Sequence, residues 1–372
     1  MKIYLVGGAV RDKLLGLPVK ERDWVVVGAS VSEMQKLGYH QVGKEFPVFL
    51  HPKTNEEYAL ARMERKVKPG YKGFTVDTSP LVSLKDDLLR RDLTINAMAE
   101  TETGELIDPY HGKEDLENKI LRHVSQAFAE DPVRILRVGR FMARYAHLGF
   151  HVARETTDLM RKMVAAGEVN ALIPERVWKE LERALGEKSP TEFFAVLASC
   201  NALPLLFPLI DMQGSGILAL AAAAQLTPQP LIRFAVLCHD FPDAKKTISG
   251  LCARYRIPNA YHELARLTAL HYASLLNAKM LSADSLLNLF STLDIYRREQ
   301  RFTHTLTACL AIAKAGGKTF DPDWLLACAQ AAKTVEVEPL LQEGLKGEAL
   351  ASKLKEKRAA AIQAWLKSRD AS

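Results

Sequence analysis

The chain has 372 residues, of which 48% are hydrophobic and 25% charged, a balance that excludes a mainly disordered protein. MKIYLVGG is interrupted by glycine too early for a signal peptide, and no apolar run reaches the length that crosses a bilayer. The net charge of +6 permits a polyanionic partner, and five cysteines without a CxxC pair are expected to be reduced core residues. We therefore expect a cytoplasmic protein of two or three domains with no membrane partner.

Strand-like and helical segments alternate along the first hundred residues. The strand-like segments are KIYLVG (2–7), DWVVVG (23–28), PVFLHP (47–52) and EYALAR (57–62), and the helical ones are AVRDKLLG (9–16) and SVSEMQKLG (30–38), the latter capped by Ser30. From about Ser83 the periodicity becomes almost wholly helical, and no strand is expected after Asp131. Breaks rich in proline and glycine at 203–216 and 315–321 divide the helical half. The pattern predicts an α/β or α+β first part followed by an all-helical body.

Two carboxylates stand close together at the start of the second strand-like segment, in KERDWVVVG (20–28). Residues two apart in a strand face the same way, so Glu21 and Asp23 are expected to point in one direction. Such a pair of like charges is tolerated in solvent or around a divalent cation. Two carboxylates suit Mg²⁺, which takes its further ligands from water and substrate phosphate. The pair by itself leaves both interpretations open.

A glycine pair in GGAVRD (7–12) precedes these carboxylates. Gly8 would let the backbone approach a ligand closely, and Arg11 adds a guanidinium suited to phosphate. A tight strand-to-helix turn is the structural alternative, whereas a dinucleotide site is disfavoured because GxGxxG is absent and an acidic pair follows. Groups that bind phosphate and groups that bind metal within one short unit favour nucleoside triphosphate chemistry.

Two later segments combine arginines with acids. In RRDLTINA (90–97), Asp92 and Asn96 share one face if the segment is helical, although exposed RRD triplets are common. In EDPVRILRVGRFMARY (130–145), Asp131 and Arg134 are three apart, which predicts either an ordinary salt bridge or a fixed acceptor and donor facing the edge of a nucleobase. Helical spacing in this second segment predicts a buried side with Ile135, Val138, Met142 and Tyr145 and an arginine flank with Arg137, Arg140 and Arg144.

Taken in order, these motifs resemble those of the tRNA nucleotidyltransferases that build the 3′ CCA end, in the bacterial branch shared with poly(A) polymerases. GGAVRD with ExD resembles the catalytic motif of that family, RRDLTINA its ribose-contacting motif and EDPVRILRVGRF (130–141) its nucleobase-reading helix. DPYHGKEDL (108–116) is similar to its connector and IPERVWKEL (173–181) to its neck helix. The resemblance implies a polymerase-β-like nucleotidyltransferase head (1–128), a helical neck (129–200), and a helical body and tail (201–372).

The resemblance implies template-free addition of C, C and A to the 3′ end of tRNA, with CTP and ATP as substrates and pyrophosphate as product. Glu21 and Asp23 would be the catalytic carboxylates and would hold Mg²⁺, with Glu21 standing where the family usually has aspartate. The implied nucleotide-binding residues are Gly8, Arg11, Arg91, Asp92, Asp131, Arg134, Arg137 and Arg140. The helical body and its basic C-terminal cluster (346–370) would grip tRNA, and the protein is expected to be a monomer or a homodimer.

Two further segments bear on the implied function. The segment Cys238 to Asp240 resembles the His–Asp doublet of a metal-dependent HD phosphohydrolase domain. The further histidine and aspartate ligands that such a domain needs are missing around it, so hydrolase activity is expected to be absent. The basic segment 62–80 resembles the flexible loop of complete CCA-adding members and favours the full reaction. The alternatives are a poly(A) polymerase, which shares the head motifs, and a non-catalytic RNA-binding homologue, which Glu21 slightly encourages.

Overall fold

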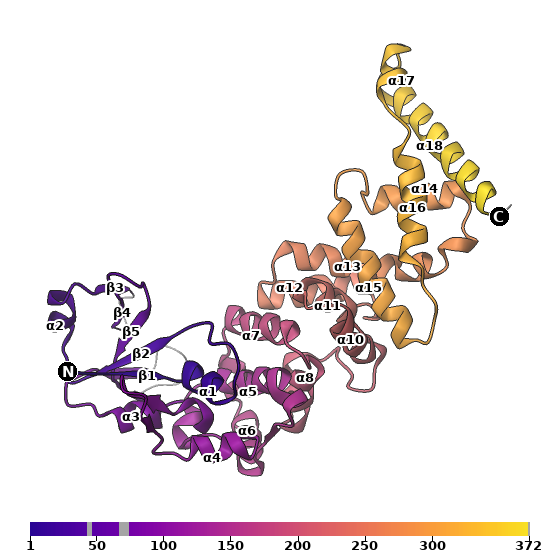
Figure 1. Ribbon diagram of the computed structural model, residues 1–372. Coiled ribbons are helices and arrows are strands. Elements are labelled where there is room, and N and C mark those ends of the chain that lie inside the picture. Colours follow the sequence, from indigo (N-terminus) through magenta and orange to yellow (C-terminus); the bar gives the residue numbers. More distant parts are fainter. Residues whose placement is uncertain (43–46, 67–73, 371–372) are drawn as a thin grey trace. The chain divides into compact units, whose positions relative to one another are not determined.

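The structure is a computed structural model that describes residues 1–42, 47–66 and 74–370 of the chain. The chain forms two compact units, Met1–Ala184 with Glu192–Pro208, and Leu185–Thr191 with Leu209–Ser372. The first unit combines a sheet with helices, and the second is built of helices (Figure 1). The first unit contains the whole range predicted as the head and most of the range predicted as the neck. The division at residues 128 and 200 stays a prediction.

Seven strands form the main sheet of the first unit, in the order β3-β4-β5-β2-β1-β8-β9. Their bounds are β1 (Lys2–Val6), β2 (Asp23–Val27), β3 (His40–Val42), β4 (Val48–Leu50), β5 (Glu57–Leu60), β8 (Ala99–Glu100) and β9 (Leu106–Ile107). β1 runs antiparallel to β2, whereas β2 runs parallel to β5. The helices α1 (Gly8–Leu14) and α2 (Val31–Lys36) follow β1 and β2, and Ser30 caps α2. The strands and helices predicted for this part of the chain are therefore confirmed.

Shorter elements complete the first unit and lead out of it. They are α3 (Leu84–Leu89), η1 (Thr94–Asn96), α4 (Gly112–Glu117), β10 (Ile120–Leu121), η2 (Gln126–Glu130), α5 (Val133–Tyr145), η3 (Ala146–Leu148), β11 (His151–Val152), α6 (Arg154–Ala165), η4 (Glu168–Ala171), α7 (Pro174–Gly186), α8 (Thr191–Ser199) and α9 (Leu203–Leu206). Gly139 lets α5 pack closely on α8, because a Cβ there would lie 3.0 Å from the ring of Phe193.

The expectation of almost uninterrupted helix from Ser83, with no strand after Asp131, is wrong. β8, β9 and β10 lie in the segment expected to be helical, and β11 pairs in parallel with β10. Each of these four strands has two residues, which is too few to produce a pattern of period two. The segment expected as a flexible loop also contains β6 (Met63–Lys66) and β7 (Phe74–Asp77), which pair with each other. Residues 67–73 of that segment, with Lys68 and Lys72, lie outside the described residues.

Alternate residues of β2 pack on opposite faces of the sheet. Val26 belongs to a cluster that includes Met34 of α2, whereas Val25 packs in a cluster with Leu88 of α3. Asp23 is two residues before Val25, so its side chain lies on the same face of the sheet as α3. The start of β2 therefore faces the RRDLTINA segment, which follows α3.

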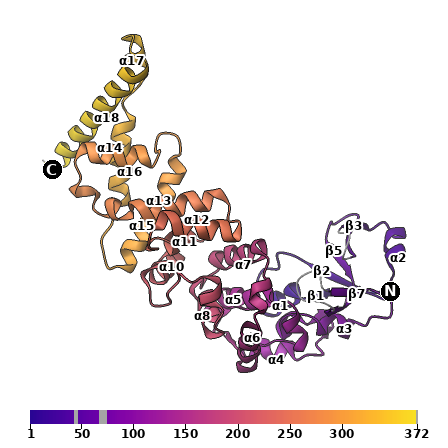
Figure 2. The same cartoon turned by 180° about the vertical axis from the view of Figure 1, so that it is seen from behind.

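The second unit is helical throughout its described part, as predicted (Figure 2). Its helices are α10 (Ser215–Leu226), α11 (Pro230–Leu237), α12 (Ala244–Tyr255), α13 (Asn259–Leu276), η5 (Ala278–Met280), α14 (Ala283–Thr292), α15 (Glu299–Ala315), α16 (Pro322–Lys333), α17 (Glu338–Gln342) and α18 (Gly347–Asp370). The predicted break at 315–321 separates α15 from α16, and the one at 203–216 contains the short α9. The five cysteines are buried, as expected. Among the described residues, none of the helices is long and apolar enough to cross a membrane.

Candidate active site

The glycine turn and the acidic start of β2 lie side by side at one end of the sheet. Val6, the last residue of β1, is paired with Asp23, so the turn begins directly beside the first residue of β2. Gly7 has φ 69° and ψ −128°, a conformation that residues with a side chain rarely adopt. Its N–H donates to the carbonyl of Met98 at 3.1 Å, which ties the turn to the segment leading into β8. Antiparallel pairing thus brings the two sequence motifs together.

Each glycine of the turn makes room for one arginine. A Cβ at Gly7 would lie 2.8 Å from Nη1 of Arg91, and a Cβ at Gly8 would lie 3.3 Å from Nη2 of Arg11. Two guanidinium groups from different segments therefore converge on the turn. Two guanidinium groups beside one turn can bind the oxygens of a polyphosphate. The sequence predicts that the glycine pair lets a ligand approach the backbone closely. In this structure, the guanidinium groups of Arg91 and Arg11 occupy the space beside the two glycines.

Arg11 is held by two acceptors and is almost fully buried. Its Nε donates to Oδ1 of Asp12 at 2.9 Å, and its Nη1 donates to Oδ1 of Asn96. Asp12 also accepts from Nη2 of Arg144 and from the hydroxyl of Tyr145, both at 2.9 Å. Burial raises the pKa of Tyr145, so its hydroxyl stays protonated and donates. Asp12 thereby fixes α1, and with it Arg11, to α5.

Arg91 is held by Asp87, whose side chain is fully buried. Oδ2 of Asp87 accepts from Nη2 of Arg91 at 3.2 Å, and Oδ1 accepts from Nη2 of Arg90 at 2.7 Å. Burial by itself raises the pKa of Asp87, but the two guanidinium groups hold the pKa below its usual value. Asp87 is therefore charged near neutral pH and fixes Arg91 beside the glycine turn.

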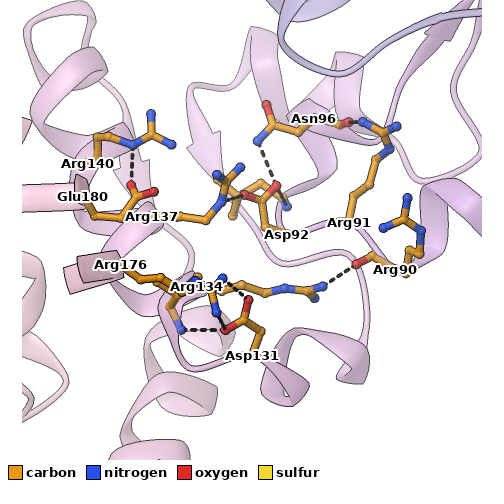
Figure 3. Close-up of polar contacts among 12 residues, drawn as sticks. Arg90, Arg91, Asp92, Asn96, Asp131, Arg134, Arg137, Arg140, Arg176 and Glu180 are labelled. Atoms are coloured by element: carbon orange, nitrogen blue, oxygen red, sulfur yellow. Dashed lines mark hydrogen bonds and ion pairs between the residues drawn. The ribbon is translucent and has the colours of Figure 1, made fainter. Parts of the chain in front are cut away.

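Asp92 and Asn96 are in contact, but not through α-helical spacing. Only a single 3₁₀ turn, η1, forms in this segment, and Asp92 precedes it. Nδ2 of Asn96 donates to Oδ1 of Asp92 at 2.9 Å, and Nε of Arg137 donates to Oδ2 at 2.7 Å (Figure 3). Burial by itself raises the pKa of Asp92, yet Arg137 and the hydrogen bond from Asn96 hold it below its usual range. This ion pair joins the RRDLTINA segment to α5.

The predicted apolar side of α5 is buried, with Ile135, Val138, Met142 and Tyr145 all at least 93% covered. Arg140, expected on the arginine flank, is buried as well. Its Nε donates to Oε2 of Glu180 in α7 at 2.5 Å (Figure 3). Burial lowers the pKa of Arg140, and the Glu180 carboxylate opposes that effect. The buried ion pair locks α5 against α7.

The two residues expected to face a nucleobase are engaged by other groups of the protein. The guanidinium of Arg134 donates to the carbonyls of Ala127 at 2.9 Å and of Arg90 at 2.6 Å. The carboxylate of Asp131 accepts from Nη1 and Nη2 of Arg176 in α7, at 3.1 and 2.7 Å (Figure 3). Asp131 and Arg134 remain neighbours through the backbone, because the N–H of Arg134 donates to the carbonyl of Asp131 at 3.0 Å.

Asp23 is the first residue of β2, whereas Glu21 lies in the preceding irregular segment, so the strand argument covers Asp23 alone. Both residues are exposed. Partial shielding of the Asp23 carboxylate from water raises its pKa, while Arg91 opposes that effect and Glu21 adds to it. The carboxylates of Glu21 and Asp23 are therefore close enough to feel each other's charge, and Arg91 is close to both the turn and Asp23.

Two neighbouring carboxylates fit a divalent cation. Within the described part of the chain, no group of three or more His, Cys, Asp or Glu side chains could hold a metal ion by itself. Two protein oxygens, with the remaining ligands from phosphate and water, are the donor set that Mg²⁺ accepts. A cation there would also relieve the repulsion between Glu21 and Asp23.

Sequence patterns did not assign four residues of this site: Asp12, Asp87, Arg176 and Glu180. Asp87 lies three and four positions before the two arginines that it binds, so its spacing is a usable signal. Arg176 and Glu180 are four apart on α7 and share one face, which contacts Asp131 and Arg140. Their partners lie more than 30 residues away in sequence, and no local pattern predicts such pairs.

Two protein-family models match parts of this chain. Residues 3–122 match the family model described as poly A polymerase head domain, and residues 149–213 match the one described as probable RNA and SrmB-binding site of polymerase A. The fold and the site define a nucleotidyltransferase.

The most informative relatives cover nearly the whole chain. The chain is 53% identical over 363 residues to the CCA-adding enzyme of Coxiella burnetii (strain RSA 331 / Henzerling II), which covers 98% of this chain and 95% of that protein. It is 50% identical over 402 aligned positions to the multifunctional CCA protein of Thioalkalivibrio sulfidiphilus (strain HL-EbGR7), covering 98% of both. The fold is similar to the Thermotoga maritima CCA-adding enzyme complexed with tRNA, with TM-score 0.69 at 21% identity over 98% of this chain and 91% of that one. The chain belongs to the family of CCA-adding enzymes.

Proposed function

We propose that this protein adds C, C and A to the 3′ end of tRNA without a nucleic-acid template, using CTP and ATP and releasing pyrophosphate. One observation carries the proposal. The carboxylates of Glu21 and Asp23 lie beside a glycine turn on which two fixed guanidinium groups, those of Arg11 and Arg91, converge. Groups for a metal ion and for a triphosphate thus meet at the end of one sheet, in a chain that belongs to the CCA-adding family.

In the proposed reaction, the 3′-hydroxyl oxygen of tRNA attacks the α-phosphorus of CTP or ATP. A new bond forms between that oxygen and phosphorus, the bond to the β-phosphate breaks, and pyrophosphate leaves while the hydroxyl loses its proton. Arg11 and Arg91 hold the negative charge of the triphosphate beside the turn, where Gly8 leaves room for the guanidinium of Arg11. When bound by Glu21 and Asp23, Mg²⁺ neutralises phosphate charge and lowers the pKa of the attacking hydroxyl.

Base selection is proposed to rest on α5 and the residues around it. Asp131 and Arg134 would face the Watson–Crick edge of the incoming base, and Arg137 and Arg140 would support base and phosphates. Asp92 would act through its ion pair with Arg137. Because Asp131 is already bound by Arg176, reading a base requires it to share or exchange that partner. A wrong base then leaves buried polar groups unpaired, at a cost of about 1–3 kcal/mol for each group.

We also propose that the second unit lacks HD phosphohydrolase activity. His239 is buried, and its Nδ1 lies 2.8 Å from the carbonyl of Val236. Asp240 accepts a hydrogen bond from the hydroxyl of Ser215 at the start of α10. A Cβ at Gly216 would lie 2.6 Å from the carbonyl of Leu237, so the doublet is packed tightly against α10. Both members of the doublet thus contribute to helix packing, and the donor set does not fit a hydrolytic metal centre.

The partner proposed for the helical unit is tRNA. Seven basic and three acidic residues lie between 346 and 370, most of them on α18, and such a charge balance suits a phosphate backbone. A cytoplasmic location is proposed because the substrates tRNA, CTP and ATP occur there.

The test is product length on a tRNA that lacks CCA. We expect CTP alone to add two residues, CTP with ATP to add three, and ATP alone to add none. Asp23→Ala should abolish incorporation while tRNA affinity is retained, and Glu114→Ala, at an exposed acid on α4, serves as the control for loss of a carboxylate. A poly(A) polymerase would instead extend A tails from ATP alone. Tight tRNA binding without pyrophosphate release would select the non-catalytic homologue.

A further inference from the structure

Asn96 touches three of the residues to which nucleotide binding is assigned, although no such role is assigned to Asn96 itself. It lies at the end of η1 and is 5% exposed. In Figure 3 its side-chain amide faces Asp92, and its backbone carbonyl faces Arg91. We propose that Asn96 is a positioning residue that sets Arg11, Arg91 and Asp92 for the nucleotide, an inference that rests on the proposed function.

The contacts use both ends of the side-chain amide and the backbone carbonyl. Oδ1 accepts from Nη1 of Arg11, and Nδ2 donates to Oδ1 of Asp92 at 2.9 Å. The backbone carbonyl of Asn96 accepts from Nη1 of Arg91 at 3.4 Å. Asp92 in turn forms an ion pair with Arg137 at 2.7 Å, which holds that guanidinium in place. One residue therefore connects the glycine turn with the arginine flank of α5: its side-chain amide holds Arg11 and Asp92, and its backbone carbonyl holds Arg91.

This position requires a side chain that both accepts and donates, as the amide of Asn96 does. Arg11 offers donors alone and an ionised Asp92 offers acceptors alone, so the residue between them must accept on one side and donate on the other. An aspartate at position 96 would accept from Arg11 but place a second carboxylate against Asp92. An alanine would leave a buried guanidinium and a buried carboxylate without this partner.

The groups that Asn96 positions serve parts shared by CTP and ATP. Arg11 and Arg91 are proposed to bind the triphosphate, and Asp92 lies in the ribose-contacting motif. Loss of Asn96 should therefore weaken both nucleotides by the same factor and leave the choice between C and A unchanged. It should also weaken pyrophosphate, which has neither sugar nor base.

The test compares Asn96→Ala and Asn96→Asp with Thr94→Val. Thr94 is buried in the same 3₁₀ turn, but its hydroxyl donates to Asp115 at 2.7 Å, away from the arginines. The measurements are kcat and KM for CTP and ATP, the inhibition constant of pyrophosphate, tRNA affinity and the melting temperature. For both Asn96 variants we expect KM and the pyrophosphate constant to rise about tenfold or more, the scale of a lost charge-assisted hydrogen bond. Thr94→Val should lower the melting temperature and leave both constants near those of the wild type.

The two Asn96 variants should also differ from each other with pH. The carboxyl group introduced by Asn96→Asp can donate to Asp92 once it is protonated, as the amide does. Lowering the pH should therefore reduce the excess KM of Asn96→Asp over wild type, whereas that of Asn96→Ala should not fall in this way.

The inference is overturned if the wild type adds C and A but the Asn96 variants keep normal KM values and pyrophosphate constants. It is also overturned if Thr94→Val raises these constants equally. A wild type that incorporates no nucleotide would instead overturn the proposed function.

Discussion

Replacing Gly7 by alanine tests the close approach of Arg91 to the glycine turn. The new Cβ would lie 2.8 Å from Nη1 of Arg91, so that guanidinium must shift from its place beside the turn. The φ of 69° and ψ of −128° at Gly7 add backbone strain of about 1–3 kcal/mol. We expect the melting temperature to fall by about 4–8 °C for 2 kcal/mol. Loss of one charge-assisted contact to the nucleotide should raise KM for CTP and ATP by about 10- to 100-fold.

Gly16→Ala is the control for the backbone strain that alanine introduces at a position with positive φ. Gly16 also has a positive φ, of 68°, but no atom lies within 4 Å of its Cβ position. Steady-state incorporation of CTP into tRNA lacking CCA, with thermal denaturation of both variants, separates strain from displacement of Arg91. We expect Gly16→Ala to lose stability alone and Gly7→Ala to lose stability and nucleotide affinity. Equal and unchanged KM values in the two variants would refute the role of the turn in holding Arg91.

Three further predictions concern the buried and the exposed carboxylates. Asp87→Asn should destabilise the protein by about 2 kcal/mol near neutral pH. The pKa of Asp87 is lower in the folded protein than in the unfolded chain. The difference in the free energy of unfolding between Asp87→Asn and wild type, measured by chemical denaturation, should therefore shrink as the pH falls below about 4. The effect of Asp23 on stability has the opposite sign. Its pKa is raised in the folded protein, so its ionised form destabilises the fold. In the absence of metal, Asp23→Asn should therefore melt at a higher temperature than wild type. The pH at which the incorporation rate falls on acidification should lie above the usual pKa of an aspartate, and it should move to lower pH as the Mg²⁺ concentration is increased. A pH dependence that does not change with Mg²⁺ would contradict the assignment of Asp23.

Local patterns predicted the parts of the site that depend on local structure. Short apolar runs predicted β1 and β2, and helical spacing identified the buried side of α5. The antiparallel register that sets Asp23 beside the glycine turn was beyond those patterns, because register depends on residues in both strands. The patterns also assigned the wrong structure to the segments of β8 to β11, where two-residue strands leave no periodic signal.

The network of buried charges could be predicted only in part. Arg11 and Arg91 follow from motifs, but the acids that hold them, Asp12 and Asp87, look in the sequence like ordinary charges on short helices. Arg140 was placed on the arginine flank of α5, but its partner Glu180 lies 40 residues later in the chain. Pairing over such distances is decided by the packing of α5 on α7, which single-sequence periodicity does not contain.

The central claim is that Glu21 and Asp23 hold a divalent ion against a triphosphate bound by Arg11 and Arg91. A crystal structure with a non-reactive CTP analogue and Mn²⁺ tests it most directly, because the anomalous signal of Mn²⁺ locates the ion. We predict a peak shared by the two carboxylates and the phosphates, with the triphosphate against the turn at Gly8. A peak away from both carboxylates, or a nucleotide bound elsewhere in the first unit, would contradict the account.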